Sequence, residues 1–243
     1  MKKTFVVGDI HGGFKALMQV LKMSSLTEKD RLIFLGDFVD GWSESFEVVD
    51  FLIGLSRNQE CIFIKGNHDD WCEQWLESEL TNDDWVTSGG QATIDSYQNR
   101  TLIEKARHLA FYQSLRSYYT DEENRLFIHA GFASVRGPKN ERYPSNYFWD
   151  RSLWEMALCL DDRLKPGDHR YPKRLKLFKE IYIGHTPTLH IGASEPVNGG
   201  NVWNIDTGAA FHGKLSMMEV GTKQVWQSDT VKDLYPGEDG RKK

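Results

Sequence analysis

Three short apolar runs near the start of the chain each end in a glycine-containing polar break, and this repeat limits the fold more than any other feature. The breaks are centred on Gly8, Gly36 and Gly66, at intervals of 28 and 30 residues. Each interval is about the length of a strand, a helix and a return crossover. Apolar residues at helical spacing lie between the breaks, at residues 14–21 and 46–53. The repeat predicts a parallel βαβαβ sheet whose polar breaks meet at its carboxyl edge.

The second half of the chain predicts a second sheet with antiparallel pairing. Residues 115–120 and 125–129 flank a polar four-residue turn and indicate a hairpin. Helices are expected over residues 69–84 and 100–113, and further strands of the second sheet over residues 181–183, 202–206 and 214–220. The polar tail from Pro236 onward is expected to be frayed.

Charge is unevenly distributed along the chain. Residues 132–180 hold eleven Lys or Arg against seven Asp or Glu, whereas the whole chain has a formal charge of −5. We therefore expect one domain spanning residues 1–243, with a basic, partly helical insert at about 132–180. The overall acidity argues against a broad nucleic-acid-binding surface.

Cysteine usage and hydropathy indicate the compartment. The three cysteines, Cys61, Cys72 and Cys159, lie far apart and form no CxxC pair. A disulfide framework or zinc knuckle is therefore not expected. No apolar run approaches the eighteen or so residues of a membrane span or the core of a secretion signal. We expect a cytoplasmic protein with no membrane partner.

Five polar motifs follow apolar runs, and their side chains suit divalent metals. The motifs are Gly8-Asp9-Ile10-His11-Gly12, Gly36-Asp37-Phe38-Val39-Asp40, Gly66-Asn67-His68-Asp69, His129-Ala130-Gly131 and Gly184-His185-Thr186. Oxygen and nitrogen donors without thiolates favour Mn, Fe or Zn. Asp9 and Asp37 at neighbouring strand ends would repel each other by roughly 4 kcal/mol at about 4 Å. A pair of cations removes that repulsion and can promote phosphoester hydrolysis.

Together these motifs resemble the calcineurin-like metallophosphoesterases. Asp40 and the distant segment Phe148-Trp149-Asp150-Arg151 are more similar to the phosphoprotein phosphatase branch, which includes bacterial and phage serine/threonine phosphatases and the related diadenosine tetraphosphate hydrolases. The resemblance implies an α/β fold, a four-layer αββα sandwich of two mixed β-sheets flanked by helices. It also implies two divalent ions, with Mn expected first and Fe or Zn as alternatives. The implied metal ligands are Asp9, His11, Asp37, Asn67, His129 and His185, with Asp37 shared by the two ions.

The resemblance also implies three further catalytic residues. His68 is similar to the general acid that protonates the leaving oxygen, and Asp40 to the carboxylate that orients this imidazole and keeps it protonated. Arg151 is similar to the arginine that grips phosphoryl oxygens, although it could instead pair with a neighbouring carboxylate. The family usually continues after the aspartate with Arg-Gly, whereas this chain has Gly41-Trp42. A second phosphate-binding arginine is thus absent, and Lys65 or a basic residue of the insert is a candidate substitute.

Asp206 and four tryptophans lie outside the five motifs but have expected positions relative to the site. Asp206 is expected to support the loop near the metals. Trp71 and Trp75, at helical spacing, are expected in the core, whereas Trp42 and Trp149 could line the substrate cleft.

Three functions follow from this pattern. The first is a serine/threonine protein phosphatase, a phosphoester hydrolase acting on a phosphorylated protein or peptide through a metal-bound hydroxide. The alternative is a symmetrical dinucleoside polyphosphate hydrolase that cleaves a small substrate such as diadenosine tetraphosphate. The third, a metal-binding scaffold without activity, is disfavoured because none of the six implied ligands is missing.

Overall fold

Strands that are apolar on both faces require a cover on both sides, and this requirement produces the layers of the molecule. In β1 (Thr4–Val7), Phe5 and Val7 pack into one hydrophobic cluster, whereas Val6 packs into another. In β2 (Arg31–Phe34) the same alternation places Leu32 and Phe34 opposite Ile33. Each strand therefore contributes to two separate cores.

Two five-stranded mixed sheets result, in a computed structural model that describes residues 2–242. The first sheet has the order β10-β9-β1-β2-β3 and the second β4-β5-β6-β8-β7. The remaining strands of the first sheet are β3 (Glu60–Phe63), β9 (Ser216–Glu219) and β10 (Val225–Gln227). Those of the second are β4 (Tyr118–Thr120), β5 (Arg125–Ile128), β6 (Glu180–Ile183), β7 (Val197–Gly199) and β8 (Val202–Asn204).

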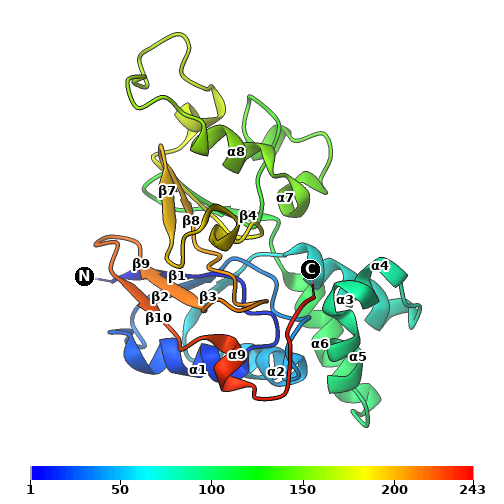
Figure 1. The fold of residues 1–243 in the computed structure, drawn as a ribbon. Coiled ribbons are helices and arrows are strands. Elements are labelled where there is room, and N and C mark those ends of the chain that lie inside the picture. Colours follow the sequence, from blue (N-terminus) through cyan, green and yellow to red (C-terminus); the bar gives the residue numbers. More distant parts are fainter. Residues whose placement is uncertain (1, 243) are drawn as a thin grey trace.

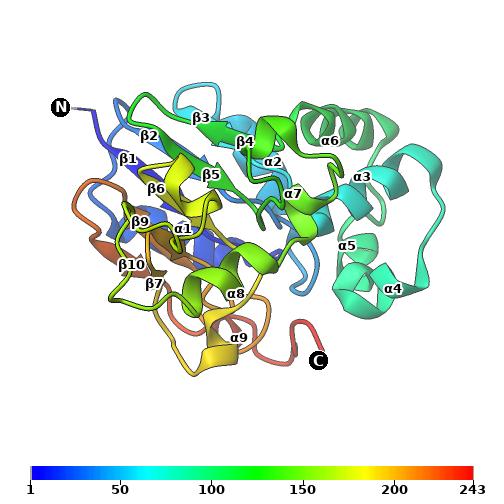
Figure 2. The same ribbon diagram turned by 90° about the horizontal axis from the view of Figure 1, so that it is seen from above.

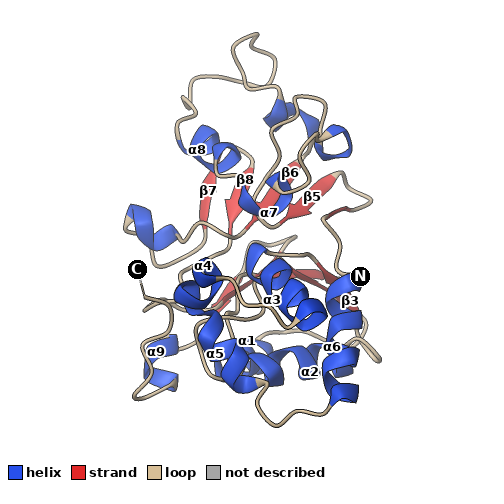
Figure 3. Ribbon diagram, turned by 90° about the vertical axis from the view of Figure 1, so that its right-hand side faces the viewer, coloured by secondary structure: helices blue, strands red, loops and turns tan. Residues whose placement is uncertain are grey.

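The sheets pack face to face, and helices cover their outer faces (Figure 1, Figure 3). Val6 and Ile33 of the first sheet meet Phe127 and Tyr182 of the second in the inner cluster, where the last two rings stack 4.9 Å apart. The fold is the four-layer α/β sandwich expected from the motifs.

Most helices cover the first sheet. They are α1 (Phe14–Met23), α2 (Ser45–Leu55), α3 (Asn67–Ser78), α4 (Asp83–Trp85), α5 (Gln91–Ser96), α6 (Leu102–Ser114) and α9 (Val231–Leu234). Figure 2 shows α3 to α6 gathered at one end of the molecule. The second sheet is covered by α7 (Asn146–Trp149) and α8 (Ser152–Leu158), which lie in the basic segment 132–180. Leu153 and Trp154 pack there against Leu126 and Ile181.

Two predictions about strands are wrong. The strand expected over 214–220 belongs to the first sheet, where β9 pairs antiparallel with the free edge of β1. The second sheet is not wholly antiparallel, because β5, β6 and β8 run parallel to one another. Periodicity predicts that such a segment is buried on both faces, but it does not identify the strand edge that the segment pairs with.

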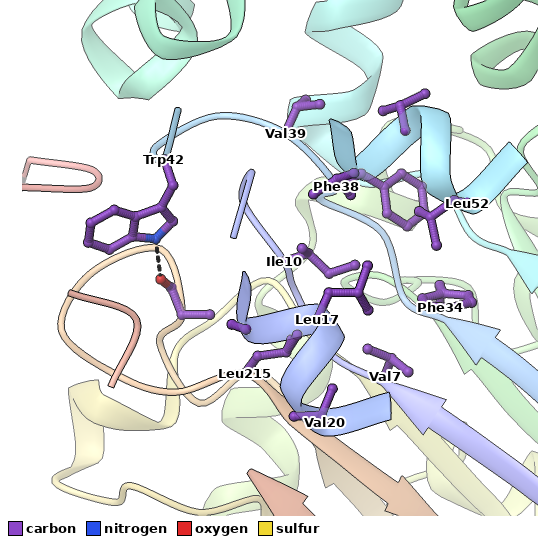
Figure 4. Close-up of a cluster of buried hydrophobic side chains, with 14 of the residues drawn as sticks. Val7, Ile10, Leu17, Val20, Phe34, Phe38, Val39, Trp42, Leu52 and Leu215 are labelled. Atoms are coloured by element: carbon purple, nitrogen blue, oxygen red, sulfur yellow. Dashed lines mark hydrogen bonds between the residues drawn. The ribbon is translucent and has the colours of Figure 1, made fainter. Parts of the chain in front are cut away.

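Two other predictions also differ from the structure. The helix expected over 69–84 ends at Ser78, because Glu79 adopts a left-handed backbone conformation and Asn82 caps the separate helix α4. Trp42 does not line a cleft. Its indole is fully buried in the core between the first sheet and its helices, and its Nε1–H donates to the carbonyl of Ala209 at 2.7 Å (Figure 4).

The tail is held in place rather than frayed. Tyr235, just before the tail, stacks on Trp42 with ring centroids 5.3 Å apart. Within the tail, Glu238 accepts hydrogen bonds from the backbone and side chain of Ser43. Composition alone missed these contacts because the partners lie almost 200 residues earlier. Among residues 2–242, every helix is too short or too polar to cross a bilayer.

Candidate metal centre

Six parallel strands end at one edge of the sandwich, three from each sheet. Strands β1, β2 and β3 run parallel, as do β5, β6 and β8. The motif residues follow the carboxyl ends of these strands, so both sheets contribute side chains to one buried site. The residues brought together there are Asp9, His11, Asp37, Asp40, Asn67, His68, His129, His185 and Asp206.

Asp37 is the centre of this site. Its side chain belongs to one cluster with His11 and His68, and to a second cluster with His129 and His185, each with donor atoms within 4.8 Å of one another. Its Oδ2 lies 3.5 Å from Nε2 of His11 and 3.4 Å from Nε2 of His129. A carboxylate shared between two groups of imidazoles has the arrangement required to bridge two cations.

Backbone carbonyls orient two of the imidazoles. Nδ1 of His11 lies 3.1 Å and 3.0 Å from the carbonyl oxygens of Val39 and Asp40, and Nδ1 of His129 lies 2.8 Å from that of Leu35. Because a carbonyl only accepts, each Nδ1 donates to it, so Nε2 is the nitrogen that faces Asp37 and could bind a metal. This is the ring orientation that a metal ligand needs.

Asn67, His185 and Asp9 complete the second side. Oδ1 of Asn67 lies 2.9 Å from Nδ1 of His185 and 3.2 Å from Nε2 of His129. Oδ2 of Asp9 accepts the backbone N–H of His185 at 2.9 Å. A Cβ on Gly184 would lie 2.0 Å from Oδ1 of Asp9, so only glycine allows this approach.

The donor atoms fit divalent metal ions. Oδ1 of Asp9 and Nε2 of His185 are buried, and neither has a hydrogen-bond partner in the part of the chain that the structure describes. Unpaired buried polar atoms are costly, and both are atoms that a cation would bind. The set contains carboxylate, amide and imidazole donors without sulfur, which suits Mn, Fe or Zn.

The pKa shifts of the buried carboxylates and imidazoles also indicate that the site favours positive charge. Burial and the neighbouring Asp206 raise the pKa of Asp9 well above its usual value. Burial alone would raise the pKa of Asp37 too, but His129 and the other imidazoles hold it well below its usual value. Asp37 in turn raises the pKa of His129 to about 10, against the effect of burial. The crowded carboxylates thus stabilise positive charge at this point.

A second group of contacts holds the imidazole of His68. Its Nδ1 lies 2.6 Å from Oδ2 of Asp40, and that oxygen also accepts the indole N–H of Trp85 at 2.7 Å. The hydroxyl of Thr93 donates to Oδ1 of Asp40 at 2.5 Å. Asp40 therefore has a fixed orientation and leaves Nε2 of His68 available. From the sequence, Trp85 has no expected role and Thr93 is expected only beside a structural turn at Gly89-Gly90; they lie 45 and 53 residues from Asp40.

Asp69 ends the third motif, which predicts no role for it. Its carboxylate is buried and accepts three backbone N–H groups, from Asp37 and Gly66 at 2.8 Å and from Phe38 at 2.9 Å. It therefore joins the loops after β2 and β3. Its position two residues after Asn67 in the third motif was the available signal.

Four site residues have backbone conformations that are rare for residues other than glycine. The φ angles of His11, Asp37, Asp40 and His185 are 52°, 52°, 75° and 67°. Each such conformation costs of order 1–3 kcal/mol and persists only where surrounding contacts fix it. Backbone strain is thus concentrated in this site.

Two tryptophans, Trp71 and Trp149, border the site. Trp71 packs edge-on against His68 at 5.2 Å and against Trp149 at 5.1 Å, so it borders the site as well as the core. Trp149 is 40% exposed and its ring lies 6.0 Å from that of His185.

Arg151 lies at the start of α8, on the same side as His185. Burial lowers the pKa of His185 well below its usual value, and the charges of His129 and Arg151 lower it further. Within residues 2–242, Arg151 forms no ion pair; Asp150 instead accepts from Ser152 and Leu153. The guanidinium is therefore exposed and available to an anion.

The chain is similar to proteins of a known family. A model of the family described as calcineurin-like phosphoesterase matches residues 2–203. The asymmetrical bis(5'-nucleosyl)-tetraphosphatase PrpE of Anoxybacillus flavithermus is 26% identical over 228 residues, covering 88% of each chain. A symmetrical bis(5'-nucleosyl)-tetraphosphatase of Coxiella burnetii is 24% identical over 283 aligned residues, covering 93% of each.

A solved structure shares the fold. A protein serine/threonine phosphatase from Saccharomyces cerevisiae superimposes with a TM-score of 0.63 at 15% identity, covering 99% of this chain and 83% of that one. At this identity the likeness concerns the fold alone.

Proposed function

The chain belongs to the calcineurin-like phosphoesterase family, and from this we propose that it is a metal-dependent hydrolase of dinucleoside polyphosphates such as diadenosine tetraphosphate. The pair of buried His/Asp clusters sharing Asp37 carries the hydrolytic part of the proposal. The curated relatives named above, both bis(5'-nucleosyl)-tetraphosphatases, support the choice of substrate.

In this proposal two divalent ions, Mn²⁺ by preference, are held by six side chains. They are Asp9, His11, Asp37, Asn67, His129 and His185. When bound, such ions lower the pKa of water and neutralise charge on the phosphoryl group being transferred. The protein's part is to fix the donors through the carbonyl contacts of His11 and His129.

His68 is proposed as the general acid. Asp40 holds the proton on Nδ1 at 2.6 Å, so Nε2 is the nitrogen that gives a proton to the departing phosphate oxygen. Trp85 and Thr93 keep Asp40 in place, since each donates to a different carboxylate oxygen. Arg151, whose neighbour Asp150 pairs with Arg174 and which forms no ion pair itself among the described residues, is proposed to bind phosphoryl oxygens.

The exposed indole of Trp149 suits a substrate that carries a base. It lies beside Trp71 and faces the edge of His185, so a purine could stack on it while the phosphates reach the clusters. Stacking of a base on an aromatic side chain is worth about 1–3 kcal/mol. A phosphoserine side chain offers no comparable group.

A phosphorylated protein or peptide is the second candidate substrate. The sequence motifs favour this substrate over the dinucleotide, because Asp40 is similar to an aspartate of the phosphatase branch. The relatives and the position of Trp149 favour the dinucleotide instead.

The two substrates are separated by a direct comparison. The purified protein is stripped of metal, reloaded with manganese and assayed on diadenosine tetraphosphate, a phosphopeptide and an aryl phosphate. We expect the highest kcat/KM on the tetraphosphate, activity abolished by chelator, and a loss of roughly a hundredfold or more in His68→Ala. Faster phosphopeptide turnover would favour the second candidate, and no activity on any of the three would favour an inactive scaffold.

A further inference from the structure

The C-terminal tail follows a fixed path toward the metal centre. Gly240 lies so close to the indole of Trp42 that a Cβ there would be 2.7 Å from its ring. The backbone N–H of Arg241 donates to the carbonyl of Ala210 at 2.8 Å. Trp42 in turn donates its backbone N–H to the carbonyl of His11 at 3.0 Å. The tail and a proposed metal-binding loop therefore pack against the same residue.

Two glycines make room for the side chain of Arg241. A Cβ on Gly41 would lie 3.2 Å from Cγ of Arg241, and one on Gly89 would lie 2.9 Å from it. Both glycines have positive φ, 118° and 107°, which disfavours any side chain there. The Cβ of an arginine at position 41 would lie against the aliphatic part of the Arg241 side chain, so the two side chains would compete for the same space.

Among residues 2–242, the guanidinium of the partly buried Arg241 has no hydrogen-bond or ion-pair partner. Its Nε is itself buried and unpaired within that range. Its Cζ lies 5.3 Å from the ring centroid of Phe211, which fixes the group without satisfying its donors. A planar set of unused donors is suited to an anion with several oxygens.

The stem of Arg241 lies beside the loop that carries His11. A Cβ on Gly41 would lie 3.2 Å from Cγ of Arg241 and 3.5 Å from the carbonyl oxygen of His11. Arg241 is therefore attached next to two loops of the metal centre, those that carry His11 and Asp40.

We propose that Arg241 is a substrate-binding residue that donates hydrogen bonds to the phosphoryl oxygens of the substrate. The C-terminal tail thereby supplies the arginine that is missing after Asp40. Lys65 does not fill this role, because it pairs with Glu73 and Asp70. This inference builds on the proposed phosphoester hydrolysis.

The test compares Arg241→Ala and Arg241→Lys with Lys242→Ala, an exposed cation one residue further along. Each manganese-loaded variant is assayed on diadenosine tetraphosphate and an aryl phosphate, and orthophosphate binding is measured by titration calorimetry. We expect Arg241→Ala to raise KM and to weaken orthophosphate binding by about tenfold to a hundredfold. Arg241→Lys should lie between, and Lys242→Ala should match the wild type.

A merely structural role would give a different result. We expect Arg241→Lys to keep the metal content of the wild type. Its near-ultraviolet circular dichroism, which reports the Trp42–Tyr235 stack, should also be unchanged. A changed spectrum together with normal orthophosphate binding would overturn the inference. If the wild type hydrolyses phosphoesters and Arg241→Ala keeps its KM and orthophosphate affinity, the inference is wrong and the proposed function stands. A wild type that binds manganese but hydrolyses nothing would instead refute the proposed function, and the calorimetry would still test Arg241.

Discussion

Nδ1 of His68 and Oδ2 of Asp40 lie 2.6 Å apart in the buried site, and Asp40 is itself held by the indole of Trp85 and the hydroxyl of Thr93. Because these donors use both carboxylate oxygens, Asp40 can present only one orientation to the imidazole. The proposed acid is thus positioned by residues that touch neither the substrate nor the metals.

The Asp40→Asn variant tests this chain of contacts. An amide in place of the carboxylate loses the charge that holds the proton on Nδ1, and its NH₂ group faces two donors. We expect kcat to fall roughly tenfold to a hundredfold with metal content unchanged. Asp84→Asn, at an exposed position, is the control and should behave as wild type. Equal kcat in both variants would contradict the positioning role.

Asp37→Ala should remove both ions, because Asp37 belongs to both clusters. His11→Ala, which alters only one cluster, should lose about half of the bound manganese. Elemental analysis of the purified variants measures this directly, with the exposed His190→Ala as control. Two ions retained per chain in Asp37→Ala would exclude the bridging arrangement.

His108 should make stability depend on pH. It is buried against Phe46 and Tyr97, and burial lowers its pKa to about 4. The unfolded chain has a histidine pKa near 6.5 and takes up a proton first as the pH falls. This contribution to stability is complete above about pH 6.5 and is lost toward pH 4, amounting to about 2 kcal/mol between pH 7 and pH 5.

Urea unfolding of wild type and His108→Gln at the two pH values isolates that contribution. The variant should lose about 2 kcal/mol less than the wild type on acidification. The exposed His169→Gln serves as control and should follow the wild type. Parallel losses in wild type and His108→Gln would show that His108 is not the cause.

Trp149→Ala should separate substrates that carry a base from those that do not. Loss of the exposed ring removes a stacking surface beside His185 but no phosphate contact. We expect KM for diadenosine tetraphosphate to rise about tenfold, while KM for an aryl phosphate changes by less than about twofold. The exposed Tyr143→Ala is the matched control. A similar rise for both substrates would point to a distorted site.

Much of the centre could be predicted from the sequence because its chemistry lies in local patterns. Each apolar run followed by Asp, Asn or His marks a strand end, and parallel strands bring their ends to one edge. This is why Asp9, Asp37, Asn67, His129 and His185 were identified together, and why the fold class was correct.

Other residues carried no such local pattern. Trp85, Thr93 and Arg241 are of ordinary residue types, and the residues that they contact at the site lie 45 to 200 positions away in the sequence. The same limit explains the error over β9, whose hydrophobic pattern predicts burial but no partner. It also explains Trp42, which lies next to the site in sequence yet points into the core.

The amino-acid sequence by itself determined the donor atoms, the strands that carry them and the edge at which they gather, because residue type and periodicity are local properties. Only the tertiary structure decided which imidazole nitrogen faces Asp37, what holds Asp40, and that the C-terminal tail brings Arg241 over Gly41. Those outcomes depend on how distant segments close around one another, and packing of that kind is fixed by the whole chain at once.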